Sequence, residues 1–489
     1  MSGVRSFRAG PSSRTLRSTY WTALLVASLA VAYLSLVGVL LVEGDVGMGA
    51  GMVIGSICLL VGGWSYFARA SARAQLEGMW PGLAFPAAFA AFHFASLGLI
   101  EAGWYAPELI PMAWSLSVSC LLAWMVGYVG GRGGRPALHE FEPRLGGVRV
   151  QLAELIRLSR WGMVLFVAGF AGELLIQARA GLGPFSAAGY TAFKAALNEG
   201  HGQASIHLFS QMCATVGAIV MVTGQALARR RLFGSVLQLA LVLAYVLALV
   251  IQGDRSELAV FVFPFFVARH YFVRPFGLGR TVAVGLIALM LAAGIKAYRG
   301  SRATDTTLQK VTDVEWVVGH TADEVGASLD TVGRSMELVP GRFDYFWGQT
   351  YVDAVARVVP SLIWNRPDAI VSSSWLTEQT SARKSAGKGG LGFSIVAEAY
   401  INFGVIGAPF ILALIGWMHG AAERILTRPR LRIELFCLYL IVESALLVHV
   451  RNSVVTYLRA SIWMATILLA LLGTYALMRR LGGAGRIGR

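Results

Sequence analysis

The chain has 489 residues, of which 56% are hydrophobic and only 14% are charged. Soluble domains carry roughly 25% charged residues, so this composition excludes an ordinary soluble protein and indicates an integral membrane protein. The net charge of +15 does not indicate nucleic-acid binding, because most of the excess arginines stand at the ends of apolar blocks, where they anchor membrane helices. The four cysteines fall inside apolar blocks and are interpreted as small buried side chains, not as disulfides or metal ligands.

Apolar blocks recur along the chain at about the 20-residue length that a helix needs to cross a bilayer. Four arginines precede the first block, which is long for a cleaved signal peptide and is expected to remain as a membrane helix. In all, the sequence predicts about twelve spans. Their ranges are 20–42, 47–68, 81–101, 109–130, 161–178, 204–228, 232–251, 257–273, 281–297, 403–420, 433–450 and 456–478.

Basic residues fix the expected orientation of these spans. Arginines gather at the N-terminus and in every second connection after it, including residues 132–160, 229–231, 269–280 and 424–432. Cytoplasmic loops are the ones that collect lysine and arginine. Both termini are therefore expected in the cytoplasm, and the intervening connections on the outer side.

One outer connection, residues 298–392, is much longer than the others, and a long loop in a compact fold is usually functional. Apolar spacing predicts a helix within 314–339 and a second one over 351–359. Residues 393–400 are expected to form an amphipathic segment on the membrane surface. The predicted parts are residues 1–297 with nine spans, 298–392 outside the membrane, and 393–489 with the amphipathic segment and three spans.

The most unusual feature is the short polar turn between the seventh and eighth spans. It contains Asp254, Arg255 and Glu257, and charges at membrane depth usually face a wet cavity or a partner. Arg255 falls on the outer side, where short loops normally lack basic residues. More basic residues are predicted at the same level, at both ends of the outer segment and before the last span. They are Arg299, Arg302, Arg383, Lys384, Lys388 and Arg451.

Two interpretations of these residues stay open. Long basic side chains often extend toward lipid phosphates, which explains any single one of them. The alternative is a site for a phosphate or diphosphate, which arginine binds through its planar, permanently charged fork. Glu398, close to Tyr400 and Asn402 in an apolar stretch, is the first candidate for a proton-transfer group. Asp254 and Glu257 are second candidates, and they are expected chiefly to orient Arg255 as ion-pair partners.

Several local motifs resemble those of bacterial O-antigen polymerases, the Wzy-type oligosaccharide repeat-unit polymerases. The similar segments are residues 253–257, 345–351, 359–361 and 390–404. The resemblance covers residues 245–420 well, and the first half of the chain is similar only in its hydropathy pattern. It implies an all-α polytopic membrane protein of GT-C-like architecture. A large, mostly helical periplasmic segment would lie between helices 9 and 10 of about twelve.

The resemblance also implies an activity. Such enzymes join undecaprenyl-diphosphate-linked glycans at the periplasmic face of the bacterial inner membrane, by glycosyl transfer without a nucleotide sugar, a metal or another cofactor. Arginines would stabilise the departing diphosphate, and a carboxylate would act as the base. Tyr345, Trp347 and Tyr351 would either stack on sugar rings or simply pack together. The implied partners are the lipid-linked glycans, membrane lipids and a chain-length regulator.

Three alternatives remain beside polymerisation. An O-antigen ligase uses the same donor, but it would be expected to place a histidine beside an arginine in the outer segment, and His320 lacks that neighbourhood. A polysaccharide flippase or other transporter would line a path across the membrane with charges, whereas here they gather at one face. A non-catalytic membrane scaffold is the third alternative.

Overall fold

The computed structural model describes most of the chain beyond residue 80. The described residues are 81–94, 109–132, 142–145, 147–179, 203–252, 255–274, 327–359, 364, 370–379, 393–427 and 430–484. The spans predicted over 20–42, 47–68 and 281–297 lie outside these ranges.

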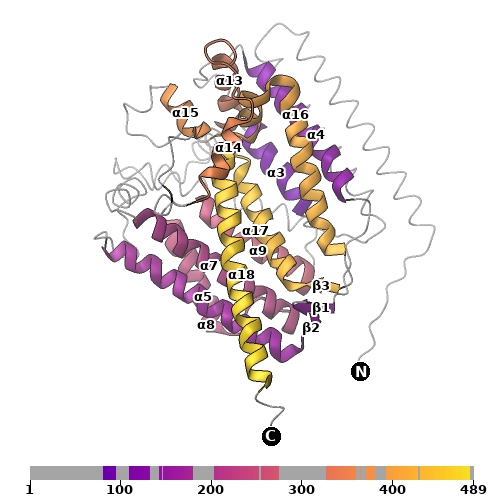
Figure 1. Ribbon diagram of the computed structural model, residues 1–489, viewed down its shortest axis with the longest axis vertical. Coiled ribbons are helices and arrows are strands. Elements are labelled where there is room, and N and C mark those ends of the chain that lie inside the picture. Colours follow the sequence, from indigo (N-terminus) through magenta and orange to yellow (C-terminus); the bar gives the residue numbers. More distant parts are fainter. Residues whose placement is uncertain are drawn as a thin grey trace, which may run out of the picture.

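Long apolar helices form the body of the molecule (Figure 1). Six helices in the described ranges are long and apolar enough to cross a membrane. They are α4 (Ile110–Arg132), α5 (Leu152–Arg179), α7 (Gln203–Arg229), α9 with the π-helical turn η3 (Arg255–Ala268 and Arg269–Val273), α16 (Ile395–Glu423) and α18 (Val454–Ala484). The shorter helices α3 (Pro81–Phe94), α8 (Val236–Gln252) and α17 (Ile433–His449) pack among them. A helix therefore lies at every predicted span that the described ranges reach, as an all-α membrane protein requires.

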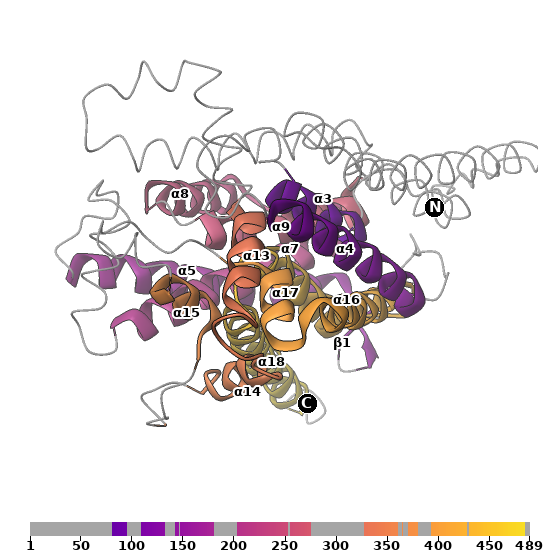
Figure 2. The ribbon, with the colours of Figure 1, turned by 90° about the horizontal axis from the view of Figure 1, so that it is seen from above.

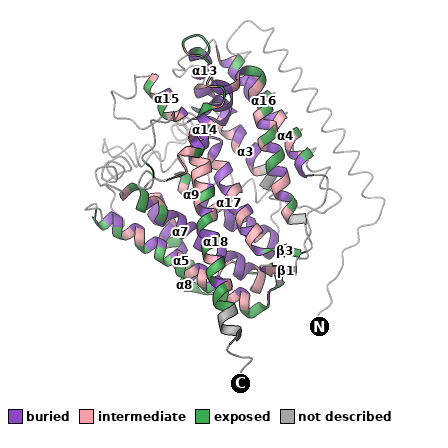
Figure 3. Ribbon diagram, in the orientation of Figure 1, coloured by how far each residue is buried: buried purple, intermediate pink, exposed green. Residues whose placement is uncertain are grey.

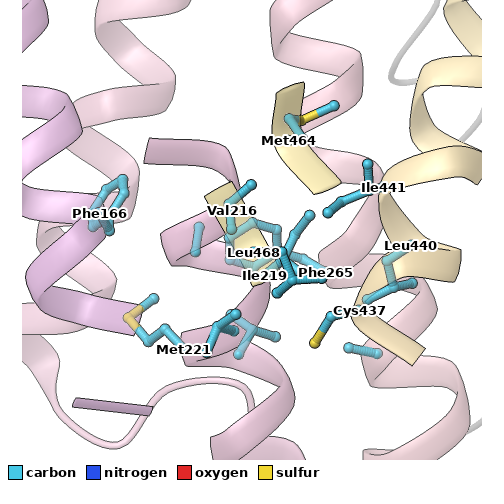
Figure 4. Packing of buried hydrophobic residues seen from close by; sticks show 14 of the residues in the cluster. Phe166, Val216, Ile219, Met221, Phe265, Cys437, Leu440, Ile441, Met464 and Leu468 are labelled. Atoms are coloured by element: carbon cyan, nitrogen blue, oxygen red, sulfur yellow. The ribbon is translucent and has the colours of Figure 1, made fainter. Parts of the chain in front are cut away.

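Two groups of buried side chains hold the bundle together. Figure 2 shows α17 between α5 and α8 on one side and α4 and α16 on the other. One group fills the space among α5, α7, α8, α9, α17 and α18 and includes Phe166, Ile219 and Leu468 (Figure 4). The other joins α3, α4 and α16 to helices of the outer segment. α17 contributes Phe436 to the first group and Leu446 to the second. The two halves of the bundle are thus packed onto one central helix.

Small residues let two pairs of helices approach closely. Gly127 and Gly131 of α4 face α16, and Gly416 and Gly420 of α16 face α4. A Cβ atom at any of these four positions would collide with backbone atoms of the other helix. α5 and α7 meet in the same way around Gly169. Small residues spaced four apart are a common means of packing helices in membranes, because the backbones themselves come into contact.

The start of α16 corrects one prediction. Residues 393–400 were expected to be amphipathic and to lie on the membrane surface, but every residue from 393 to 402 is buried. Residues 395–402 form the first part of α16, which bends at Gly404, where φ is 68° and ψ is −167°. The difference arises because α3, α4 and α13 (Ala327–Leu338) surround this stretch with apolar side chains. Beyond the bend, α16 turns apolar side chains such as Ile406 and Phe410 outward (Figure 3).

Three helices from the long connection 298–392, which keeps the name outer segment after its predicted side, gather around the start of α16 (Figure 1). α13 lies within the region predicted as helical at 314–339, and α14 (Gln349–Ala356) overlaps the second predicted helix. α15 (Ser372–Gln379) was not anticipated. α13 buries Leu329, Val332 and Met336, whose spacing places them on one face of the helix. That face anchors the outer segment to the spans.

A small sheet at the other end of the bundle was also not anticipated. Its strands β1 (Glu142–Leu145), β2 (Val148–Arg149) and β3 (Arg430–Arg432) have the order β2-β1-β3, with β1 antiparallel to β2 and parallel to β3. The sheet joins the connection after α4 to the connection after α16. Arg479 of α18 pairs at 2.8 Å with Glu154 of α5 at the same end. The connections after α4 and after α16, the start of α5 and the end of α18 thus lie at one end of the bundle.

Candidate functional site

The first turn of α16 is fixed by a serine. The Ser394 hydroxyl oxygen accepts hydrogen bonds from the backbone N–H groups of Val396 and Ala397, at 3.1 and 3.3 Å. This is ordinary N-capping of a helix. The same oxygen lies 2.8 Å from Nε2 of His93. The start of α16 is therefore tied to α3, and the next turn is held in a defined position.

Glu398, one turn further along α16, is the centre of a polar site. Its side chain is 1% exposed. The Ser372 hydroxyl donates to Oε1 at 2.7 Å, and the backbone N–H of Val454 donates to Oε2 at 2.6 Å. Nε2 of His449 lies 3.9 Å from Oε2. One carboxylate thus connects α15 of the outer segment, the end of α17 and the first turn of α18.

The turn between α17 and α18 lies directly beside this carboxylate. The backbone N–H of Phe393 donates to the carbonyl oxygen of Arg451 at 3.1 Å, and that of Ile395 donates to Val450 at 3.4 Å. The half-buried Arg451 guanidinium stands 5.7 Å from the centre of the Phe92 ring. Arg451 therefore lies in the turn whose backbone carbonyl groups hold the start of α16.

Asn402, one turn beyond Glu398, holds the turn that precedes α14. Its side chain accepts from the N–H of Gly348 at 3.0 Å and donates to the Thr350 hydroxyl at 2.7 Å. It also donates to the carbonyl oxygen of Glu398 at 2.7 Å. The Trp347 N–H donates to the Asn402 carbonyl at 3.1 Å. Trp347 has a positive φ of 49°, a costly conformation for a bulky residue, and these bonds hold it.

Replacing Asn402 with alanine is expected to lower the free energy of unfolding by about 2–4 kcal/mol, because several buried hydrogen bonds are lost at once. Thermal unfolding of the purified protein in detergent measures this loss. Asn452→Ala is the matched control, since the Asn452 side chain is only half-buried and, among the described residues, donates one hydrogen bond, to the Val448 carbonyl. Equal melting temperatures for the two variants would show that Asn402 does not hold the turn.

The three aromatic residues predicted to meet sugars differ in accessibility. Tyr351 stacks on Phe403, with ring centres 6.0 Å apart, and burial, with a smaller contribution from Glu398, raises the pKa of its phenol. Tyr345 packs against Gly404 and Tyr400. Trp347 alone is widely exposed, at 76%. Of the three residues, Trp347 is the most exposed, whereas Tyr345 and Tyr351 are only partly exposed.

The remaining predicted residues are placed only in part. Arg255 is the first residue of α9, and Glu257 lies half-buried in the first turn of the same helix. The Tyr400 hydroxyl donates to the Val339 carbonyl at 2.7 Å, which ties α16 to the end of α13. The side chain of Arg255 and several complete residues lie outside the described part of the chain. These residues are Asp254, Arg299, Arg302, His320, Arg383, Lys384 and Lys388.

Other polar contacts at the site escaped prediction. Ser372, Thr350 and His449 carry no signal that distinguishes them from ordinary structural residues of their types. A second polar contact was not predicted either, because Glu443 of α17 lies 2.5 Å from Nε2 of His419, far along α16 from Glu398. The i, i+4 pair His419 and Glu423 on an apolar helix was the signal for this second polar region.

These observations define a multi-pass, mainly helical membrane protein with a buried carboxylate where an outer segment meets its spans. A model of the family described as O-antigen polysaccharide polymerase Wzy matches residues 154–479, more than half of the chain. The chain therefore belongs to the O-antigen polysaccharide polymerase Wzy family. No curated protein and no solved structure matches it. Family membership supports the general activity of a glycosyltransferase-type polymerase of O-antigen repeat units.

Proposed function

We propose that the protein polymerises undecaprenyl-diphosphate-linked repeat units at the periplasmic face of the bacterial inner membrane, with both termini in the cytoplasm. One growing glycan leaves its lipid diphosphate and is transferred to a hydroxyl of a second lipid-linked unit. No metal takes part in this proposal. The lipid chains lie against the apolar outer faces of spans such as α16, where Ile406 and Phe410 are exposed.

The observation that carries the proposal is the hydrogen bonding of Glu398. Its Oε1 already accepts a hydrogen bond from a hydroxyl, that of Ser372, at 2.7 Å. An acceptor sugar hydroxyl in the place of Ser372 would stand within the distance that a general base needs to take its proton. Because Glu398 is buried, the acceptor reaches it only when α15 moves aside. Glu398 is therefore proposed as the base, with Asp254 and Glu257 as orienting partners of Arg255.

Basic residues are proposed to stabilise the departing diphosphate. Arg255 begins α9, and the N-terminus of a helix itself favours bound anions. Arg451 follows the end of α17, next to the start of α16. Positive groups fixed where negative charge develops lower the barrier to glycosyl transfer. Arg299, Arg302, Arg383, Lys384 and Lys388 are proposed to extend the same surface. We further propose that a chain-length regulator acts with the protein.

Arg255→Ala is expected to shorten the glycan, because a lost diphosphate contact slows each transfer. The measurement is the length distribution of O-antigen on gels, in a strain that lacks its own copy of the gene. Arg231→Ala is the control, since Arg231 is an exposed arginine in the connection between α7 and α8 at the other end of the bundle. If the O-antigen of the Arg255→Ala variant had the same long-chain ladder as the wild type, then Arg255 would not bind the diphosphate.

A further inference from the structure

A buried histidine stands beside the proposed base. His449 is the last residue of α17, and its side chain is 3% exposed. Its Nε2 lies 3.9 Å from Oε2 of Glu398, which is within ion-pair distance but too far for a hydrogen bond. Both side chains are enclosed by protein. An imidazole and a carboxylate at this distance can exchange a proton after a small movement of either side chain, because hydrogen bonds that serve in catalysis are often long before the substrate binds.

The ring of His449 is oriented by stacking. It lies against the ring of Tyr457 of α18, with ring centres 5.0 Å apart and an angle of 9° between the two planes. Stacking occupies a face of the imidazole, whereas its two nitrogens point outward from the ring edge. Within the described part of the chain, neither Nδ1 nor Nε2 makes a hydrogen bond. Buried polar groups without a partner are rare in proteins, and a catalytic role is one of the reasons for them.

The hydrogen-bond partners of Glu398 cannot take up a proton from it. The Ser372 hydroxyl and the Val454 N–H group both donate to the carboxylate, and neither of them is a base. An imidazole, in contrast, gains and loses a proton readily near neutral pH. Of the contacts that Glu398 makes in the described part of the chain, His449 therefore supplies the proton acceptor.

Each glycosyl transfer leaves a proton on the base. In the proposed reaction, the acceptor oxygen forms a bond to the anomeric carbon of the donor sugar. The bond from that carbon to the diphosphate oxygen breaks, and its electron pair stays on the diphosphate. The proton of the acceptor hydroxyl moves to Glu398. Glu398 must lose this proton before it can act again, and its burial slows the loss of the proton to bulk water.

We propose that His449 takes the proton from Glu398 after each transfer and so restores the base. This inference rests on the proposed function, in which Glu398 is the base. A half-turn about the Cγ–Cδ bond of Glu398 exchanges its two oxygens, so the protonated oxygen turns from the acceptor toward His449. Nε2 of the neutral imidazole takes up the proton, and Glu398 becomes a carboxylate again. The imidazolium then releases the proton to water at the turn after α17, where Arg451 and Asn452 are half-buried.

Separate measurement of the first and the later transfers tests the inference. Purified full-length protein in detergent, wild type or His449→Gln, is mixed with an excess of lipid-linked repeat units, and the product is quantified by gel through the first turnover and beyond it. His449 acts through Glu398 and does not touch the acceptor. The first transfer by the variant is therefore expected at about the wild-type rate, because Glu398 starts as a carboxylate. Later transfers are expected to slow by at least about tenfold, since a positioned proton-transfer group contributes about 100-fold or more.

Two further variants serve as controls. His419→Gln replaces a similarly buried histidine whose Nε2 lies 2.5 Å from Oε2 of Glu443 instead, and this variant is expected to slow neither the first transfer nor the later ones. His449→Asn removes the same imidazole with a shorter amide, and it is expected to behave as His449→Gln does. The melting temperature of each variant is compared with that of the wild type. If His449→Gln folds poorly, then His449→Asn carries the test.

The time course distinguishes a proton acceptor from a structural residue. A burst of one transfer per protein molecule followed by slow turnover, absent from the wild type, supports the inference. Equal slowing of the first and later transfers would show that His449 only holds Glu398 in place, and an unchanged rate throughout would show that it has no role. Either of these results overturns the inference and leaves the polymerase proposal standing. A folded wild type that transfers no repeat unit overturns both.

Discussion

Glu398→Gln is expected to slow glycan polymerisation by at least about 100-fold, the usual contribution of a general base. An amide is nearly the same size as a carboxylate, but it cannot take a proton from the acceptor hydroxyl. Glu398→Asp is expected to keep measurable activity, because it keeps the carboxylate and only shortens its reach. The assay uses purified protein and lipid-linked repeat units, with chain growth followed by gel.

The stability of the Glu398→Gln variant separates catalysis from structure. Glutamine still offers one oxygen to the Val454 N–H group, which Glu398 accepts at 2.6 Å, so the melting temperature is expected to fall only slightly. Glu443→Gln is the control, since Glu443 is an equally buried carboxylate that pairs with His419 instead. Full activity in the Glu398→Gln variant would exclude Glu398 as the base and leave it as an anchor between helices.

Gly416→Leu is expected to abolish the folded protein. A Cβ at Gly416 would collide with the backbone of α4 at Trp124. A flexible side chain could move away from such a contact, but a helix backbone cannot. The cost should exceed about 3 kcal/mol, the upper part of the range for overpacked cores. The yield of monodisperse protein after purification, together with its melting temperature, measures the effect.

Gly130→Leu provides the matched control on the other helix of the pair. A Cβ at Gly130 meets no atom within 4 Å, so that variant is expected to fold normally. If Gly416→Leu also gave normal yields, then the close contact between α4 and α16 would not be needed for folding. Glu398 and Asn402 are residues of α16, so that outcome would also contradict the conclusion that the packing of this helix on α4 positions the site.

The helices at the predicted spans that the described ranges reach were predictable, because length and hydropathy mark an apolar helix long enough to cross a membrane. The start of α16 was not, because residues 393–402 are buried by α3, α4 and α13, which come from distant parts of the chain. The short sheet was not predicted for the same reason, since β1 and β3 are separated in the sequence by several helices. Local patterns carry no information about such long-range neighbours.

The candidate site was predictable to a similar degree. Glu398 and Asn402 stood out because polar residues are unexpected in an apolar stretch. Their partners Ser372, Thr350 and Val454 were not predictable. Serine and threonine are common residues, every residue but proline has a backbone N–H group, and only the fold brings these groups to Glu398 and Asn402.

The decisive measurement uses purified protein reconstituted in lipid vesicles with undecaprenyl-diphosphate-linked repeat units. EDTA is added, and nucleotide sugars are left out. A ladder of longer lipid-linked glycans is expected, with one undecaprenyl diphosphate released for each unit added. If the repeat units remain unextended while the protein is folded and correctly inserted, then the chain does not carry out glycosyl transfer from a lipid diphosphate on its own.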